Sequence, residues 1–344
     1  MMSSQAVALL EKVLAGTHLT EEEVESMLHA MGTGELPAPL AGGLLAALRA
    51  KGEVAAEIRG AARAMRDLAV RPDIPDDGAY VDIVGTGGDG SASLNLSTGS
   101  ALLAAACGAQ VVKHGNRSIS SRSGSADALM ALGLPVPLVD QQIGDCLRDT
   151  GFTFLFAPNH HPAMRHIGPV RAAMGVRTLF NILGPLTNPA KPPFNVIGAF
   201  SEPMAELMAE TLSGMEATRS IVVHGACGWD EPTPVGPFIC FDVRTGSVVR
   251  EVRDPADYGL ARCTEDTLRG GEPEENAARL RDALYGGDTQ AHRDALALGA
   301  ALALEVTGAA PDAASAVQRA RMVLEDGGGR AFMQRLQAFA SSVD

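Results

Sequence analysis

The stretch Tyr80–Asp127 constrains the possible fold more than any other part of the chain. It opens with apolar residues 80–84 next to glycines, a pattern typical of a buried strand, and continues into the glycine-rich loop 85–90. A small-residue apolar segment then predicts a helix, and Gln110–Val112 predicts a second short strand before a basic and serine-rich loop. Strand, helix and strand form a βαβ unit, whose two loops lie at one edge of a parallel sheet. Open α/β sheets bind their ligands at that edge.

The residues of these two loops indicate an anionic ligand. Glycines let backbone N–H groups converge on an anion without interference from side chains. Ser97 or Thr98 is expected to cap the following helix, whose N-terminus favours negative charge. Lys113 and Arg117 add positive charges, and the serines of loop 118–125 add hydroxyl donors. The pattern predicts a phosphate- or diphosphate-rich ligand held between two facing loops; a plain glycine-rich turn beside a solvated basic loop is the alternative.

Two common phosphate-binding motifs do not fit. No G-x-x-x-x-G-K-[ST] sequence occurs, which argues against a P-loop. Residues 85–90 match G-x-G-x-x-G, but a dinucleotide fold also needs a helix that begins at the third glycine and an acidic residue at the end of the next strand. Here the helix is expected several residues later and the next strand ends in Lys113, so a nicotinamide cofactor is disfavoured.

An acidic pair follows another predicted strand. Ser220–His224 runs into a turn that holds Asp230 and Glu231 between glycines and prolines. Mg²⁺ prefers one or two carboxylates together with phosphate oxygens of the substrate and water. An exposed acidic turn is the simpler interpretation, but the expected position at the same sheet edge as loop 85–90 favours a magnesium site.

Residues 157–193 are the most basic part of the chain after the Lys113 loop. Two helices are expected here, one from Pro162 and one from Pro169, because proline is common near a helix start. Scattered arginines usually lie on a solvated helix face, but their expected place beside an anion-binding edge favours a function for some of them. Adjacent histidines, such as those at 160 and 161, cannot easily chelate one metal ion from a helix.

Composition limits the remaining classes of function. The 344 residues are enough for two domains, and 46% hydrophobic residues with interspersed charge are typical of a globular protein. The net charge of -13 argues against nonspecific nucleic-acid binding, so local positive charge and metal must meet a phosphorylated ligand. The five cysteines are scattered without C-x-x-C, which argues against a zinc site or a disulfide framework. No secretion signal or membrane-spanning apolar run is visible, so no membrane partner and a cytoplasmic location are expected.

The N-terminal part predicts a helical module without paired chemistry. Thr20 and Glu23 form the pattern of a capping box at the start of a helix over Glu21–Met31. Such a module serves packing or dimerisation, and the Pro-, Asp- and Gly-rich residues 71–78 indicate a linker after it. Further strands are expected at 152–156, 195–199, 238–241 and 247–252, and further helices at 40–51, 54–68, 126–132, 203–212, 274–284, 292–306, 312–325 and 330–340.

Several segments resemble the signature of the anthranilate phosphoribosyltransferase family, and the resemblance covers nearly the whole chain. The segments are GTGGDG at 85–90, NLSTG at 95–99, KHGNRSISSRSGSAD at 113–127, HHPAM at 160–164, PVRAAMGVRT at 169–178 and FNILGPLTNP at 180–189. The resemblance implies the nucleoside-phosphorylase-like phosphoribosyltransferase fold. A small helical domain, 1–72 completed by part of 160–190, would pack against a larger α/β domain, 73–344, with a mostly parallel central sheet. The site would lie in the cleft between domains, and the helical domain would form a homodimer.

The resemblance also implies the reaction and its residues. The family transfers the phosphoribosyl group of phosphoribosyl diphosphate to anthranilate, in tryptophan biosynthesis. Mg²⁺ would be held by Ser97, Asp230 and Glu231, and catalysis would depend on Lys113 and the same acidic pair. Arg171 matches the arginine that faces the anthranilate carboxylate, which an arginine fork can hold through two parallel hydrogen bonds. The implied substrate-binding residues are Gly85, Gly88, Asp89, Ser93, Asn95, Leu96, Ser97, Thr98, Lys113, His114, Gly115, Asn116, Arg117, Ser118, Ile119, Ser120, Ser121, Ser125 and Arg171.

Some expectations stay open from the sequence alone. His114 is the nearest candidate for a general base, and a structural role for it is an equal alternative. Trp229 replaces the leucine of the family's GLDE motif and puts the local loop shape in doubt. A pyrimidine-nucleoside phosphorylase would share the fold, but it would not need paired acids for magnesium. A non-enzymatic relative that binds nucleic acid should have a basic surface and eroded loops, which this acidic chain does not have.

Overall fold

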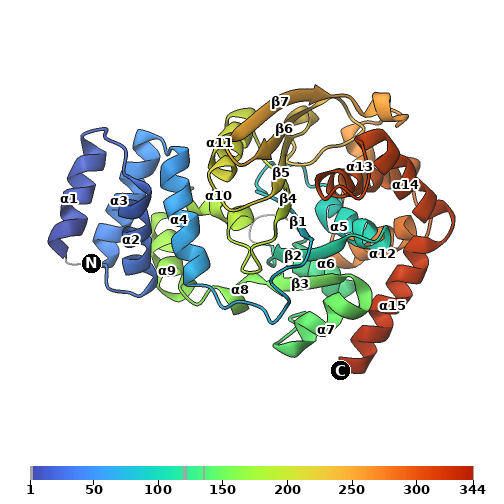
Figure 1. Cartoon of the computed structure of the whole chain (residues 1–344), viewed down its shortest axis with the longest axis horizontal. Coiled ribbons are helices and arrows are strands. Elements are labelled where there is room, and N and C mark those ends of the chain that lie inside the picture. Colours follow the sequence, from blue (N-terminus) through green and yellow to red (C-terminus); the bar gives the residue numbers. More distant parts are fainter. Residues whose placement is uncertain (1–2, 119–121, 135, 344) are drawn as a thin grey trace.

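The computed structural model describes residues 3–118, 122–134 and 136–343. Figure 1 shows a bundle of N-terminal helices on one side of the molecule and a larger α/β domain on the other. The chain passes from the first to the second through the linker after residue 67 and returns to the bundle once, with the helices between β3 and β4. This arrangement confirms the predicted small helical domain beside an α/β domain.

Four N-terminal helices form the bundle, and local sequence signals explain where they begin. Thr20 Oγ1 accepts a hydrogen bond from the Glu23 N–H at 3.2 Å, and the Glu23 carboxylate accepts one from the Thr20 N–H at 2.8 Å, so the predicted capping box is confirmed. The second helix then buries Val24, Met27 and Leu28 at helical spacing. The bounds are α1 Ser3–Leu14, α2 Glu21–Gly32, α3 Ala38–Lys51 and α4 Ala55–Asp67.

A seven-stranded sheet forms the centre of the α/β domain in the part of the chain that the structure describes, with the order β3-β2-β1-β4-β5-β6-β7. The first five strands of this order are parallel, and the last two form an antiparallel hairpin at one edge. The strand order reverses between β1 and β4, where ligands of open α/β sheets bind. The bounds are β1 Tyr80–Gly85, β2 Gln110–Gly115, β3 Phe152–Phe156, β4 Phe194–Gly198, β5 Arg219–His224, β6 Phe238–Arg244 and β7 Ser247–Arg253.

Successive residues of the strands enter two different apolar clusters, because side chains alternate between the faces of a sheet. Val196 and Ile221 pack in the cluster that contains the C-terminal helices, whereas Ile197 and Val222 pack in the cluster that contains the helical bundle. The sheet is therefore covered on both faces, as its apolar strands require. The covering helices of the α/β domain are α5 Leu96–Ala106, α6 Ser125–Ala131, α7 Gln141–Thr150, α11 Glu202–Ser213, α12 Pro273–Leu284, α13 Gln290–Val306, α14 Ala313–Glu325 and α15 Gly328–Val343.

The segment between β3 and β4 differs from the prediction. Instead of helices beginning at Pro162 and Pro169, it contains the helices α8 Ala157–His160, α9 Met164–Met174 and α10 Phe180–Leu183. Pro169 lies inside α9. The helix continues through it because the only lost hydrogen bond is the one to the carbonyl of Arg165, an exposed residue. Helix α9 packs against α2 and α3, and its Ile167 and Val170 join the apolar cluster of the bundle.

Within the described ranges, no helix is long and apolar enough to cross a membrane.

Candidate active site at the carboxyl edge of the sheet

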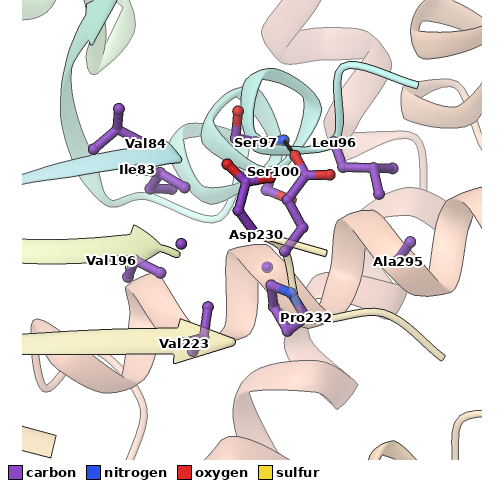
Figure 2. A pocket seen from close by; sticks show the side chains of 13 residues that line it. Ile83, Val84, Leu96, Ser97, Ser100, Val196, Val223, Asp230, Pro232 and Ala295 are labelled. Atoms are coloured by element: carbon purple, nitrogen blue, oxygen red, sulfur yellow. Dashed lines mark hydrogen bonds between the residues drawn. The ribbon is translucent and has the colours of Figure 1, made fainter. Parts of the chain in front are cut away.

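A pocket opens beside the carboxyl ends of β1 and β4, where the strand order reverses (Figure 2). Val84 of β1 and Gly198 of β4 line it from the sheet, and Ser97 lines it from the start of α5. Asp230, from the loop after β5, points its carboxylate toward Ser97 across the ends of the strands. The topology thus brings together residues that lie more than 130 positions apart in the sequence, as the Ser97–Glu231 bond shows.

The acidic pair is bound to the backbone of both neighbouring loops. Asp230 Oδ2 accepts a hydrogen bond from the Gly87 N–H at 2.6 Å. Glu231 Oε1 accepts from the Ser97 N–H at 2.9 Å, and its Oε2 accepts from the Ser93 hydroxyl at 3.1 Å. The Asp230 N–H in turn lies 3.3 Å from Asp89 Oδ2. The glycine loop and the acidic turn therefore form one structure, as the predicted magnesium site requires.

These contacts also correct the prediction for the start of α5. Ser97 and Thr98 do not cap the helix, because the helix begins at Leu96 and both residues lie inside its first turn. The free N–H of Ser97 is instead bonded by the Glu231 carboxylate. A carboxylate is favoured at this position by the positive end of the helix dipole.

Burial and mutual repulsion hold protons on the acidic pair. Burial, followed by the charge of Asp89, raises the pKa of Asp230 to about 7. Burial, followed by the charges of Asp230 and Asp89, raises the pKa of Glu231 to about 8. Among the described residues none of these three carboxylates has a cationic partner within ion-pair distance. Three converging carboxylates without a counter-ion fit a divalent cation, which would remove the repulsion and release the protons.

Lys113 lies beneath the same edge and is 1% exposed. Its ammonium donates a hydrogen bond to the Ile83 carbonyl at the end of β1. Burial lowers the pKa of Lys113, and the charges of Asp82, Glu231 and Asp230 oppose that shift. The lysine thus supplies a positive charge close to the acidic pair, without an ion pair that would neutralise it.

The serine-rich loop faces the glycine loop across the start of α5. The carboxylate of Asp127 organises it by accepting the N–H groups of Ser118 and Gly124, both at 3.0 Å. Asn95 Nδ2 donates to the Ser123 carbonyl at 3.0 Å and so ties this loop to the turn before α5. The predicted residues Asn116 and Arg117 are exposed at the mouth, and Ser125 donates to the Asn116 carbonyl, whereas Ile119, Ser120 and Ser121 lie outside the described residues.

A pair of buried histidines lies behind the basic loop. The Nε2 atoms of His114 and His161 are 3.2 Å apart, and the rings meet edge to face. Burial lowers the pKa of His114 to about 3 and that of His161 to about 4, so both rings are neutral at pH 7. His160 does not join them, because its Nδ1 is bonded to the Val70 carbonyl at 2.8 Å.

Two arginines of the segment between β3 and β4 have different surroundings. Arg171, at the end of α9, is half-buried with its guanidinium 5.2 Å from the centre of the Phe180 ring. Arg177 donates to the Gly88 carbonyl at 2.9 Å and lies 5.0 Å from the Phe200 ring centre. Arg177 thereby joins this segment to the glycine loop. No local pattern in the sequence indicates this contact, since the two partners are 89 positions apart.

Two further features test the predicted site. Trp229 is 3% exposed and packs in the apolar core below the acidic pair, so the bulky side chain does not occupy the pocket.

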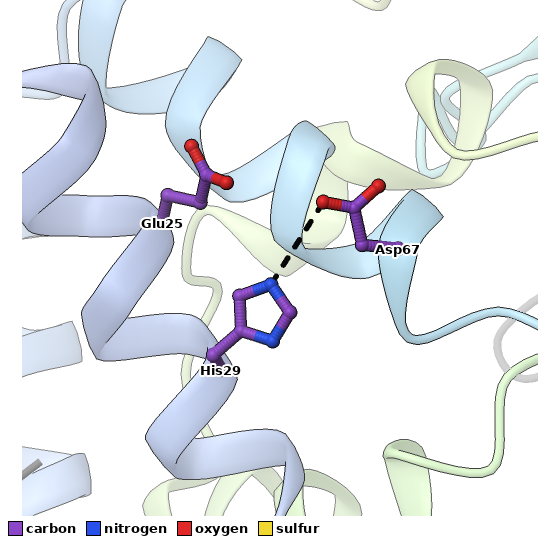
Figure 3. Close-up of side chains that lie close together, drawn as sticks. All are labelled: Glu25, His29 and Asp67. Carbon is purple, nitrogen blue, oxygen red and sulfur yellow. Dashed lines mark ion pairs between the residues drawn. The ribbon is translucent and has the colours of Figure 1, made fainter.

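A second group of possible metal ligands, Glu25, His29 and Asp67, lies in the helical bundle (Figure 3). Its Asp67 lies 3.9 Å from both the His29 ring and the Lys191 ammonium, so side chains of this chain already balance its charge.

Comparison with known proteins places this geometry in a class. Residues 7–69 match the family described as "Glycosyl transferase family, helical bundle domain", and residues 77–330 match "Glycosyl transferase family, a/b domain". The helical bundle, the sheet and the loops at its carboxyl edge together define a two-domain glycosyl transferase of this class.

Individual relatives narrow the class. The anthranilate phosphoribosyltransferase of Methylobacterium nodulans is 44% identical over 97% of this chain and 98% of its own, and that of Rubrobacter xylanophilus is 44% identical over 95% of each. The crystal structure of the Thermus thermophilus enzyme has a TM-score of 0.90 at 44% identity and covers 97% of this chain and 99% of its own. The Saccharomyces cerevisiae enzyme in complex with PRPP and Mg shares the fold, with a TM-score of 0.88 at 23% identity over 99% of each chain. The chain belongs to the anthranilate phosphoribosyltransferase family.

Proposed function

We propose that this protein transfers the 5-phosphoribosyl group of phosphoribosyl diphosphate to the amine of anthranilate and releases diphosphate. The observation that carries the proposal is that hydrogen bonds link three loops at the carboxyl edge of the sheet. The glycine loop after β1 is bonded to the acidic turn after β5, and both this turn and the serine-rich loop after β2 are bonded to residues at the start of α5 or just before it. The relatives named for this reaction cover nearly the whole chain at 44% identity, and the Saccharomyces cerevisiae relative was solved with PRPP and Mg.

The chemistry follows from where negative charge develops. When the bond between the ribose C1 and diphosphate breaks, the leaving group gains charge that the site must stabilise. Ser97, Asp230 and Glu231 would hold Mg²⁺, whose charge would stabilise the departing diphosphate. Lys113 adds a second positive charge from beneath the sheet edge. The backbone N–H groups of the glycine loop donate to the diphosphate oxygens and fix their position.

The acceptor needs orientation more than activation. An aromatic amine is unprotonated at neutral pH, so its lone pair is free without a strong base. Arg171 binds the carboxylate of anthranilate and holds the amine in line with C1, which is an effect of proximity. His114 and His161 contact each other and are both neutral at pH 7, so neither ring adds charge behind the basic loop.

The direct test is loss of anthranilate fluorescence when phosphoribosyl diphosphate and Mg²⁺ are added to the purified protein. The double variant Asp230→Asn, Glu231→Gln should lose magnesium-dependent turnover, whereas Asp67→Asn, which removes an acid of the other possible metal cluster, should keep it. A double variant with the normal magnesium response would refute the metal assignment. Wild-type protein that cleaves nucleosides with phosphate instead would establish the phosphorylase alternative.

The assembly and domain limits belong to the same proposal. We infer a homodimer formed through the helical domain, and a helical domain completed by residues of 160–190. Val7 and Leu14 of α1 support the dimer, because these apolar side chains are 46% and 64% exposed on the bundle. The packing of α9 on α2 and α3 supports the discontinuous domain. Light scattering during size-exclusion chromatography should give twice the mass of the 35.6 kDa chain, and Val7→Glu with Leu14→Glu should give monomers. A location in the cytoplasm is the expected one for this reaction.

A further inference from the structure

The backbone ladder between β1 and β2 stops halfway. The two strands pair at Tyr80 with Gln110 and at Val81 with Val111, and no farther. Yet β1 pairs with β4 as far as Gly85, and β2 pairs with β3 as far as Gly115. Both strands are therefore well formed, but the ladder between them stops before the end that carries the active-site loops.

Side chains bind the backbone groups that would form the next hydrogen bonds of the ladder. At this register the His114 N–H would donate to the Ile83 carbonyl, and the Ile83 N–H would donate to the Val112 carbonyl. Instead the His114 N–H donates to Asp82 Oδ1 at 3.2 Å, and the Ile83 carbonyl accepts the Lys113 ammonium. The Val112 carbonyl accepts from Asn188 Nδ2 at 2.9 Å. Three groups left by the split ladder, the His114 N–H and the carbonyls of Ile83 and Val112, thus have side-chain partners.

The partners of the split ladder form a dry, fully bonded unit. Asp82 is 0% exposed, and Asn188 and Lys113 are each 1% exposed. The Asn188 amide also donates to Asp82 Oδ2 at 2.8 Å, and its oxygen accepts the Ala190 N–H at 2.9 Å, so its orientation is fixed. A buried carboxylate is costly unless it is hydrogen-bonded, and here it has two donors, the His114 N–H and Asn188 Nδ2, and a nearby ammonium. Burial raises the pKa of Asp82 to about 6, and the charge of Lys113 and these donors oppose that shift.

We propose that Asp82 and Asn188 are positioning residues, which hold the end of β2 away from β1 so that Lys113 can reach the edge where diphosphate departs. The inference rests on the proposed function. In a closed ladder the Ile83 carbonyl would accept the His114 N–H, so the Lys113 ammonium would have to share that oxygen with a second donor. The split also fixes the start of the basic loop through the His114 N–H. Asn188, from the segment that returns from the helical domain, connects that segment to the lysine strand.

A purely structural role would lower stability without a selective effect on the chemical step, so the test needs a matched control. Thr211 of α11 is 0% exposed, and its Oγ1 donates to the Leu207 carbonyl at 2.7 Å. Thr211→Val therefore removes a buried side-chain hydrogen bond from a helix that packs on β5 and β6. Asp82→Asn provides a third variant that keeps the shape and removes the charge.

The variants should be assayed by anthranilate fluorescence at saturating phosphoribosyl diphosphate, anthranilate and Mg²⁺, with kcat expressed per folded enzyme. Asn188→Ala and Asp82→Asn should lower kcat at least tenfold and leave KM for anthranilate within about twofold, whereas Thr211→Val should keep kcat within about twofold. Hydrogen exchange of the peptide 110–116 should accelerate in the first two variants alone. Equal loss of kcat in Asn188→Ala and Thr211→Val, or wild-type kcat in Asp82→Asn, would overturn the inference. Failure of the proposed function would instead appear as an inactive wild-type protein.

Discussion

Replacing Gly198 by alanine should disable the magnesium site without changing any proposed ligand. Gly198 is the last residue of β4, and a Cβ atom there would lie 1.5 Å from the Asp230 carbonyl oxygen and 2.6 Å from its carbonyl carbon. Real Cβ atoms do not approach other heavy atoms closer than 3.0 Å, so the backbone of the acidic turn must retreat by about 1.5 Å. The nearest atoms belong to the backbone, so no rotamer change can relieve the clash.

The size of the effect follows from the geometry that magnesium requires. Mg²⁺ holds oxygen ligands at about 2.0–2.1 Å in near-octahedral geometry, so a ligand displaced by about 1.5 Å is lost. We expect the magnesium concentration for half-maximal turnover to rise at least tenfold and kcat to fall. Overpacking of this kind typically costs about 1–3 kcal/mol of unfolding free energy.

A magnesium titration of anthranilate fluorescence loss and a urea unfolding curve measure both effects. Gly43→Ala is the control, because Gly43 lies inside α3 and, among the described residues outside its own helix, the added Cβ would meet only Leu10 Cδ2, at an ordinary 3.6 Å. Alanine is the better helix former there by about 1 kcal/mol, so the control should keep its magnesium response and gain some stability. A Gly198→Ala protein with wild-type magnesium dependence and unfolding midpoint would refute the packing argument.

Three other substitutions probe the acceptor site, the bundle and the buried histidines. Arg171→Ala should mainly raise KM for anthranilate, because it removes the proposed carboxylate partner; unchanged KM in steady-state kinetics would contradict that role. Glu57→Ala should lower the unfolding free energy by about 3 kcal/mol, because it leaves the Lys51 ammonium, which is 2.9 Å from Glu57 and 5% exposed, without its carboxylate partner. A shift of the urea midpoint worth less than about 1 kcal/mol would contradict this expectation. Burial lowers the pKa of His161 from 6.5 to about 4 in the folded protein. Its contribution to the free energy of unfolding is therefore complete above pH 6.5 and is lost as the pH falls toward 4. His161→Gln should therefore reduce the stability difference between pH 7.5 and pH 5 by about 2 kcal/mol, and an unchanged difference between urea curves at the two values would count against it.

The sequence was sufficient where local pattern decides the structure. Apolar runs bounded by glycine predicted the strands β1 and β3, and the pattern Thr20 to Glu23 predicted the start of α2. The prediction failed at the start of α5, where the N–H of Ser97 is bonded by a carboxylate from a distant loop. A helix cap supplied by tertiary structure leaves no trace in the neighbouring residues, so capping rules point to the nearest hydroxyl instead.

The site was predicted in its parts but not in its connections. The acidic turn and the glycine loop each have a composition that indicates their chemistry, and their contact follows from the parallel sheet. Arg177 and Asn188 were missed because their partners come from other elements. Asp127 offered a local signal, because its carboxylate accepts the N–H of Gly124, three residues earlier, at the start of α6. Asp82 did offer a signal, since an aspartate in the apolar run Tyr80–Val84 must find buried donors if that run is a strand.

Binding of phosphoribosyl diphosphate with Mg²⁺ should release protons from the acidic pair. The acidic pair lines the pocket that would admit an anionic substrate, in a chain whose net charge is already -13. Burial first, and then neighbouring carboxylates, raise the pKa of Asp230 to about 7 and that of Glu231 to about 8, so the pair is partly protonated at neutral pH and must lose those protons to bind metal. Affinity should therefore rise as the pH increases from 6 to about 8.

Calorimetric titrations in buffers of different ionisation enthalpy measure that release directly. The observed enthalpy should depend on the buffer at pH 7 and become independent of it near pH 9, where the pair is already ionised. Glu231→Gln removes the group with the higher pKa and should lower the proton release at pH 7.5, whereas Glu25→Gln in the bundle should leave it unchanged. A wild-type enthalpy that is the same in all buffers at pH 7 would show that the pair binds metal already ionised. The raised pKa values, and with them the account of how an acidic protein admits a diphosphate, would then be wrong.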